Sequence, residues 1–162
     1  MFGRRCSKDS PRVEAYGSVD ELNAALGLAR ALGLSEKVEL MLDAAQERLV
    51  SLMGELATLP ADLPTYRSKY PTLSEADVAW VEQEAYALEQ QEGIHFSGWA
   101  RPGKGMNPAA AQLDVARTVC RRAERQTLAL HRQEPLDNAS LLLFLNRLSD
   151  LLWLAARYES HE

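Results

Sequence analysis

The segment from residue 138 to residue 158 constrains the fold more than any other part of the chain, because apolar residues cover nearly the whole circumference of the helix it would form. These apolar residues are Leu141, Leu142, Leu143, Phe144, Leu145, Leu148, Leu151, Leu152 and Leu154. A helix that is apolar on all sides is buried among other elements. The exceptions on one face are Asn146, Asp150, Trp153 and Arg157. Because an unpartnered buried polar group costs about 1–3 kcal/mol, these side chains either pair with neighbouring helices or border a site.

Four further segments carry apolar residues at the three- and four-residue spacing that is typical of helices packed on one side. Their starts are marked by a Ser18–Glu21 capping box and by capping residues at Ser35, Ser74 and Asn107. We predict helices from 18 to about 33, 35 to 58, 74 to 92 and 107 to about 132, with irregular segments at 1–17, 59–73 and 93–107. No alternating β-branched pattern competes, so we expect an all-α, five-helix up-down bundle. Residues 1–162 are expected to form a single domain, opened by the basic N-terminal segment.

Composition excludes several classes of function. A net charge of −5 argues against a general nucleic-acid-binding protein, whose domain is normally basic. Cys6 and Cys120 have no suitably spaced histidines, so they predict neither a disulfide framework nor a zinc site, and we expect a reducing compartment, the cytoplasm. The N-terminus lacks the apolar core of a secretory signal, and no apolar run reaches the roughly 18 residues of a membrane span. We therefore expect no membrane-spanning segment.

One face of the helix predicted from 107 to 132 carries the arginine row, which we define as Arg117, Arg121, Glu124 and Arg125. These positions are three or four residues apart and therefore neighbours on a helix. A salt-bridged surface helix would explain the spacing. Arginine, however, is also the residue best suited to grip phosphate or carboxylate through a planar fork of donors. A local basic site on an acidic protein suits a small polyanion.

The sequence excludes the common metal and nucleotide motifs. The histidines are His95, His131 and His161, and none follows a glutamate at the spacing of a di-iron bundle. No nucleophile elbow, P-loop or dinucleotide fingerprint is present. An arginine row with one glutamate, together with Asn146, fits a nucleoside triphosphate with magnesium, because arginines bind phosphate oxygens and Glu or Asn holds the metal or its waters.

Four stretches of the chain resemble the PduO-type ATP:cob(I)alamin adenosyltransferases in sequence and in order. They are VEAYGSVDELNAALGLARAL (13–32), GELATLP (54–60), ARTVCRRAERQ (116–126) and LNRLSDLLWLAARYE (145–159). The resemblance implies a homotrimer of five-helix bundles that binds ATP, Mg²⁺ and a corrinoid between subunits. It implies transfer of the adenosyl group of ATP to cob(I)alamin, giving adenosylcobalamin and triphosphate.

The resemblance also assigns roles to residues of the arginine row. Arg121 and Arg125 would bind the triphosphate, and Asp20 would form a salt bridge to Arg121 across the subunit boundary; these three are the expected catalytic residues. Arg117 would support the same cluster.

Two further residues are assigned to the nucleotide and its metal. Glu124 would lie by the magnesium and the nucleotide, and Asn146 would contact the nucleotide. Cobalt(I) would attack the ribose 5′ carbon without a protein base. The protein would then act by positioning and by charge neutralisation.

Two departures from the family pattern leave alternatives open. The family's Gly-rich N-terminal segment wraps the ATP phosphates, whereas this sequence starts at what looks like the Phe-Gly that follows it, and Arg4, Arg5 or Lys8 would have to replace it in part. The segment from Phe96 through Asn107 is longer than the family's Pro-Gly-Gly turn, and Phe96 would lie near the corrinoid. The chain is then an active adenosyltransferase, a catalytically weak homologue that binds a corrinoid or another ligand as carrier or regulator, or a bundle that only trimerises.

Overall fold

The computed structural model describes residues 6–91, 93–94 and 101–161, and every regular element in these ranges is helical. The α-helices are α1 (Pro11–Ala31), α2 (Glu36–Ala57), α3 (Leu63–Arg67), α4 (Glu75–Tyr86), α5 (Pro108–Gln133) and α6 (Ser140–His161). A 3₁₀ turn, η1 (Pro60–Asp62), follows α2, and a π-helical turn, η2 (Ala87–Gln91), follows α4. The all-α prediction is confirmed. The predicted number of helices is wrong, because the described residues hold six and the short α3 was not expected.

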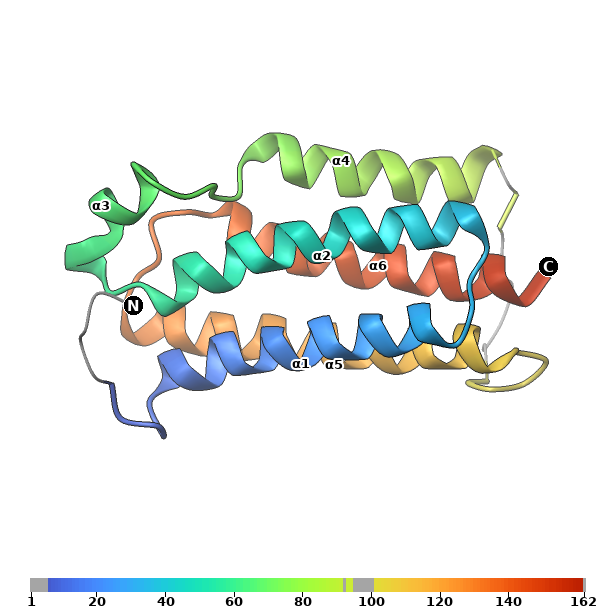
Figure 1. Cartoon of the computed structure of the whole chain (residues 1–162), viewed down its shortest axis with the longest axis horizontal. Coiled ribbons are helices and arrows are strands. Elements are labelled where there is room, and N and C mark those ends of the chain that lie inside the picture. Colours follow the sequence, from blue (N-terminus) through green and yellow to red (C-terminus); the bar gives the residue numbers. More distant parts are fainter. Residues whose placement is uncertain (1–5, 92, 95–100, 162) are drawn as a thin grey trace.

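The long helices form an up-down bundle in which each runs opposite to the one before it (Figure 1). α1 and α2 lie side by side in front of α5 and α6, and α4 runs along the edge next to α2 and α6 (Figure 1). The largest contacts join α1 to α5 and α5 to α6, and α4 also packs on α6. α6 therefore lies between α5 and α4, the central place that its apolar circumference predicts.

The core is continuous along α6. Phe144, Leu145, Leu148 and Leu152 are fully buried there and join one hydrophobic cluster with the inward faces of the other helices. Leu143 departs from the pattern, because about half of its surface is exposed. Interiors are close-packed, so this shared core fixes how α5 and α6 lie against each other.

Three predicted helix starts and one predicted stop are confirmed by capping geometry. The side chains of Ser35 and Asn107 accept backbone N–H groups of the first turns of α2 and α5, and Ser74 forms a capping box with Asp77 at the start of α4. Gly33 follows the end of α1 with φ of +90°, a conformation that glycine adopts without steric cost.

The predicted start of the first helix is wrong. Ser10 caps α1, its hydroxyl accepting the N–H of Val13 at 3.3 Å, and Pro11 takes the first helical position. Ser18 is buried inside the helix and donates its hydroxyl to the carbonyl of Glu14 at 2.9 Å. The described irregular N-terminal segment therefore ends at residue 10 rather than at residue 17.

Two other boundaries also differ from expectation. The segment 59–73 holds η1 and α3 rather than only a loop, because Tyr66 packs back into the interior with 3% of its surface exposed. α4 ends at Tyr86 and continues as η2, where the sequence predicted α-helix to 92.

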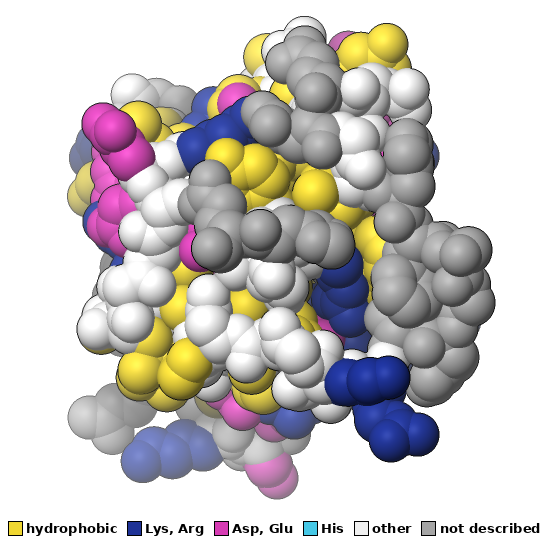
Figure 2. All heavy atoms as spheres, turned by 90° about the vertical axis from the view of Figure 1, so that its right-hand side faces the viewer, with side chains coloured by type: hydrophobic (Ala, Val, Ile, Leu, Met, Phe, Trp, Pro, Cys, Tyr) yellow, Lys and Arg dark blue, Asp and Glu magenta, His cyan; other side chains and the backbone are white. Residues whose placement is uncertain are grey.

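The end of the bundle at which α1 turns into α2 and α5 begins shows apolar side chains at its centre, with Lys and Arg side chains nearby (Figure 2). Among the described residues, no helix combines the length and apolarity needed to cross a lipid bilayer.

Candidate functional site

α5 places Arg121 and Arg125 on its outward face because its opposite face is committed to the core. Ala116, Cys120, Ala123 and Thr127 are all fully buried on that opposite face. Both arginines are exposed, and neither forms a hydrogen bond or ion pair with the described part of the chain. By contrast, Arg12, Arg67 and Arg157 all hold carboxylates. Two free guanidiniums one turn apart give this face donors of the kind that bind anions.

Glu124 lies in the same row and is fixed by α6. The Nδ2 of Asn146 donates to the Oε1 of Glu124 at 3.0 Å, and both side chains are half-buried. At the same level, the thiol of Cys120 donates to the carbonyl of Leu145 at 3.2 Å. The arginine row and the polar face of α6 therefore meet at Glu124 and Asn146.

Three charged side chains, Glu124, Arg121 and Asp150, act on the buried thiol of Cys120. Burial raises the pKa of the Cys120 thiol, and the charges of Glu124 and Asp150 raise it further while Arg121 lowers it. These three charged groups therefore lie close enough to the thiol to act on it. Cys120 itself stays a neutral, buried thiol under a charged surface.

Arg117 is held by a carboxylate that the sequence did not single out. Asp114 is 4% exposed and accepts the Nε of Arg117 at 3.1 Å. It also accepts Nη1 and Nη2 of Arg157, at 2.8 and 3.1 Å. Burial alone would raise the pKa of Asp114, but the hydrogen bonds from Arg157 and Arg117 outweigh it, so the pKa is lowered. Asp114 therefore carries a negative charge at neutral pH, one helical turn before Arg117.

A groove of about 490 Å³ lies between α4 and α6, and its Arg147 donates to Asn146, the partner of Glu124, at 3.4 Å. Its lining residues are Glu82, Ala85, Tyr86, Glu89, Arg147, Asp150, Trp153 and Leu154. Arg147 donates to Glu82 at 2.9 Å across it, and the guanidinium of Arg157 lies 4.6 Å from the ring centroid of Trp153. The sequence placed Asp150 and Trp153 on one face but did not predict the groove, because its other wall comes from α4.

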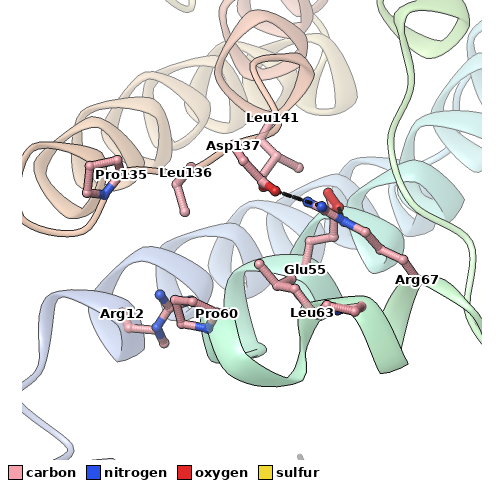
Figure 3. A pocket seen from close by; sticks show the side chains of 10 residues that line it. Arg12, Glu55, Pro60, Leu63, Arg67, Pro135, Leu136, Asp137 and Leu141 are labelled. Atoms are coloured by element: carbon pink, nitrogen blue, oxygen red, sulfur yellow. Dashed lines mark hydrogen bonds and ion pairs between the residues drawn. The ribbon is translucent and has the colours of Figure 1, made fainter.

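A second cavity of about 230 Å³ lies at the opposite end of the bundle, under α3 (Figure 3). Its arginines are already neutralised. Arg67 forms a two-point pair with Asp137 and also bonds Glu55 (Figure 3). Arg12 pairs with Glu134. This cavity therefore offers no free charge to a ligand.

Asp20 and Lys8, also predicted as site residues, form no hydrogen bond or ion pair with the row among the described residues. Asp20 is exposed on α1 and has no partner among the described residues, while its neighbour Glu21 pairs with Arg122 of α5. Lys8 is exposed before α1. Phe96 lies outside the described residues.

The residues near the row could hold magnesium only together with substrate phosphates, and not in a site made of protein ligands alone. No group of three or more His, Cys, Asp or Glu side chains converges in the part of the chain that the structure describes. Mg²⁺, however, is usually held by one or two carboxylates together with substrate phosphates and waters. Glu124, oriented by Asn146, fits that role beside two free arginines.

Comparison with known proteins agrees with this geometry. The corrinoid adenosyltransferase PduO of Salmonella typhimurium is 36% identical over 161 residues, which is 99% of this chain and 46% of that protein. The chain thus spans about half the length of its PduO relatives. A corrinoid adenosyltransferase of Bacillus subtilis is 39% identical over 164 residues, covering 97% of this chain and 78% of that one.

A solved structure is also similar. It is a variant PduO-type ATP:corrinoid adenosyltransferase from Lactobacillus reuteri complexed with cobalamin and ATP, with 34% identity and a TM-score of 0.84 over 99% of this chain and 87% of that one. The family model of cobalamin adenosyltransferase matches residues 1–159. The chain therefore belongs to the cobalamin adenosyltransferase family.

Proposed function

We propose that the chain transfers the adenosyl group of ATP to cob(I)alamin. In this reaction the cobalt(I) electron pair forms a bond to the ribose 5′ carbon, the C5′–O bond breaks, and triphosphate leaves with that bond's electrons. The observation that carries the proposal is the free pair Arg121 and Arg125 beside the fixed Glu124–Asn146 contact. Relatives that carry the name of this activity, and one solved with cobalamin and ATP, support it.

The arginine row would act on the leaving group. Arg121 and Arg125 would bind the triphosphate oxygens, where negative charge grows as the C5′–O bond breaks. Because both guanidiniums are free in the described chain, no ion pair within that chain has to be broken to bind the anion. Asn146 would contact the nucleotide while it orients Glu124.

Magnesium, when bound, would neutralise part of the phosphate charge, with Glu124 as its protein ligand. The remaining work is positioning, since attack by cobalt(I) needs no proton transfer from a side chain. The groove between α4 and α6 would accept the corrinoid, because Tyr86, Trp153 and Leu154 give it an apolar wall next to the row. Excluding water there would protect the reduced cobalt.

The site would be completed in a homotrimer, with Asp20 of one copy paired to Arg121 of the next. Both are exposed and lack partners among the described residues of their own chain. We also place the protein in the cytoplasm, because its cysteines, Cys6 and Cys120, are both free thiols.

The decisive variant is Arg125→Ala. We expect adenosylcobalamin formation from MgATP and chemically reduced cobalamin to fall by about 100-fold or more, the range typical of losing one group that stabilises developing charge. The melting temperature should not change, because Arg125 has no partner to lose among the described residues. Arg132→Ala is the matched control, since Arg132 is exposed on the same helix two turns further on.

If the wild-type protein forms no adenosylcobalamin, the transferase proposal is wrong. Separate isothermal titrations with MgATP and with cobalamin then show whether the chain binds a ligand without turning it over. Equal losses in Arg125→Ala and Arg132→Ala would show that the effect is one of net charge and not of a specific phosphate contact.

A further inference from the structure

The Asp114 carboxylate lies where the two halves of the proposed site meet. It is buried in the second turn of α5 and accepts three hydrogen bonds, one from Arg117 and two from Arg157. One negative charge thus faces two positive charges in the interior. Replacing buried ion pairs of this kind with packed apolar side chains often leaves a protein equally or more stable. Stability alone is therefore a weak explanation for the Asp114 cluster.

The two arginines are held in different ways. Arg157 donates both terminal nitrogens to Asp114 and is itself 8% exposed, so its guanidinium is not available to a ligand. Arg117 donates only through its Nε, and it forms no hydrogen bond or ion pair with any described residue other than Asp114. Its terminal nitrogens therefore remain as donors, one helical turn from Arg121.

Arg157 links the same carboxylate to the groove. Its guanidinium stacks on the Trp153 ring, 4.6 Å from the centroid, and its Nη1 lies 3.4 Å from the Trp153 carbonyl. Trp153 in turn lines the groove between α4 and α6. A change at Asp114 would release Arg117 on one side and Arg157 with its stacked ring on the other.

We propose that Asp114 is a positioning residue that aims the terminal fork of Arg117 at the triphosphate and, through Arg157, fixes Trp153 as the wall of the corrinoid groove. This inference rests on the proposed function. It makes Asp114 and Arg157 the link between nucleotide binding and corrinoid binding, although neither touches a substrate.

The first test is Asp114→Asn, measured by isothermal titration with inorganic triphosphate and MgATP and by the KM values for ATP and cobalamin. We expect triphosphate affinity to fall about tenfold, as for loss of one oriented charged hydrogen bond, and both KM values to rise. In an Arg117→Ala background the same substitution should cause no further loss of triphosphate affinity, because Asp114 acts on triphosphate through Arg117.

The second test is Arg157→Lys, which leaves Asp114 paired and able to hold Arg117 but removes the planar group stacked on Trp153. We expect cobalamin affinity to fall severalfold and triphosphate affinity to stay the same. This variant also keeps the test valid if Asp114→Asn does not fold. Asp137→Asn is the matched control, because it breaks a two-point pair with Arg67 at the other end of the bundle.

The outcomes separate this inference from the function on which it rests. A wild-type protein that binds neither triphosphate nor cobalamin overturns both. A wild-type protein that is active, with Asp114→Asn lowering only the melting temperature, overturns the positioning role alone. So does a loss of triphosphate affinity of equal size with and without Arg117, or an Arg157→Lys variant that affects triphosphate as much as cobalamin.

Discussion

Asp114 carries a buried negative charge between Arg117 and Arg157, so its protonation should destabilise the fold. Its pKa is lowered in the folded protein, below the value of about 4 typical of an unfolded chain. A group of this kind adds stability above the unfolded pKa, and that stability is lost as the pH falls through the folded pKa. The loss is therefore expected at acid pH, below about 4.

We expect the melting temperature of the wild-type protein to fall more steeply between about pH 4 and pH 2 than that of Asp114→Asn, which has no proton to gain at this position. Thermal unfolding followed by circular dichroism across this range measures the difference. Asp137→Asn should flatten the curve less, because Asp137 is exposed and its pair with Arg67 is screened by solvent. Parallel curves for wild type and Asp114→Asn would contradict the expectation.

The same residue shows what could not be predicted at this scale. The arginine row follows from helical spacing, and the family resemblance assigns Glu124 and Asn146 to the same nucleotide. The hydrogen bond between these two side chains is a finding of the structure that neither of them predicted. The Asp114–Arg157 pair joins residues 43 positions apart, and no local pattern indicates it. The spacing of three residues between Asp114 and Arg117 could have predicted the contact of Asp114 with Arg117, but not the one with Arg157.

At the scale of elements, Gly54 shows how one missing side chain fixes the position of α3. A Cβ at Gly54 would lie 2.8 Å from the Tyr66 ring carbon Cζ and closer still to its hydroxyl oxygen. Tyr66 is buried and stacks on Tyr70, with ring centroids 5.1 Å apart. α3 can therefore cover the end of α2 only because position 54 is glycine.

Gly54→Ala should accordingly lower the free energy of unfolding, by about 1–3 kcal/mol, the range for overpacking a core. In an open helix the same substitution stabilises by up to about 1 kcal/mol, because alanine is the better helix former. Gly17→Ala in α1 is the control, since nothing lies within 4 Å of the added Cβ, and it should stabilise. Urea unfolding of both variants measures the two effects. Stabilisation by both would show that α3 moves away at little cost.

Capping residues predicted three helix starts correctly and one, that of α1, wrongly. The capping residues at Ser35, Ser74 and Asn107 located three helices. For α1 the Ser18–Glu21 pattern predicted the wrong start, although Pro11 directly after Ser10 is itself a start signal. Tertiary contacts decide such cases, and burial of Ser18 against the core excludes it from an end.

At the scale of the whole molecule, the proposed site needs more than one chain. Asp20 and Arg121 are both exposed and without partners in the described part of the chain, while Glu21 and Arg122 pair within it. The chain thus uses the second acidic residue and the second arginine internally. In the proposed homotrimer, the first of each would pair with a neighbouring copy, as in a closed ring in which every interface repeats the same contact.

This arrangement predicts complementation between inactive variants. Asp20→Ala and Arg121→Ala should each abolish adenosylcobalamin formation alone, but co-expressed in equal amounts they should recover about one quarter of wild-type activity, since that share of interfaces pairs two intact residues in a random ring. Arg121→Ala with Arg125→Ala is the control: both residues belong to the same face of α5, so no mixed interface is complete and no activity should return. Activity assays on the purified mixtures, with their mass in solution measured by light scattering, test this. Recovery in both mixtures, or in neither, would show that Asp20 and Arg121 do not meet across a subunit boundary.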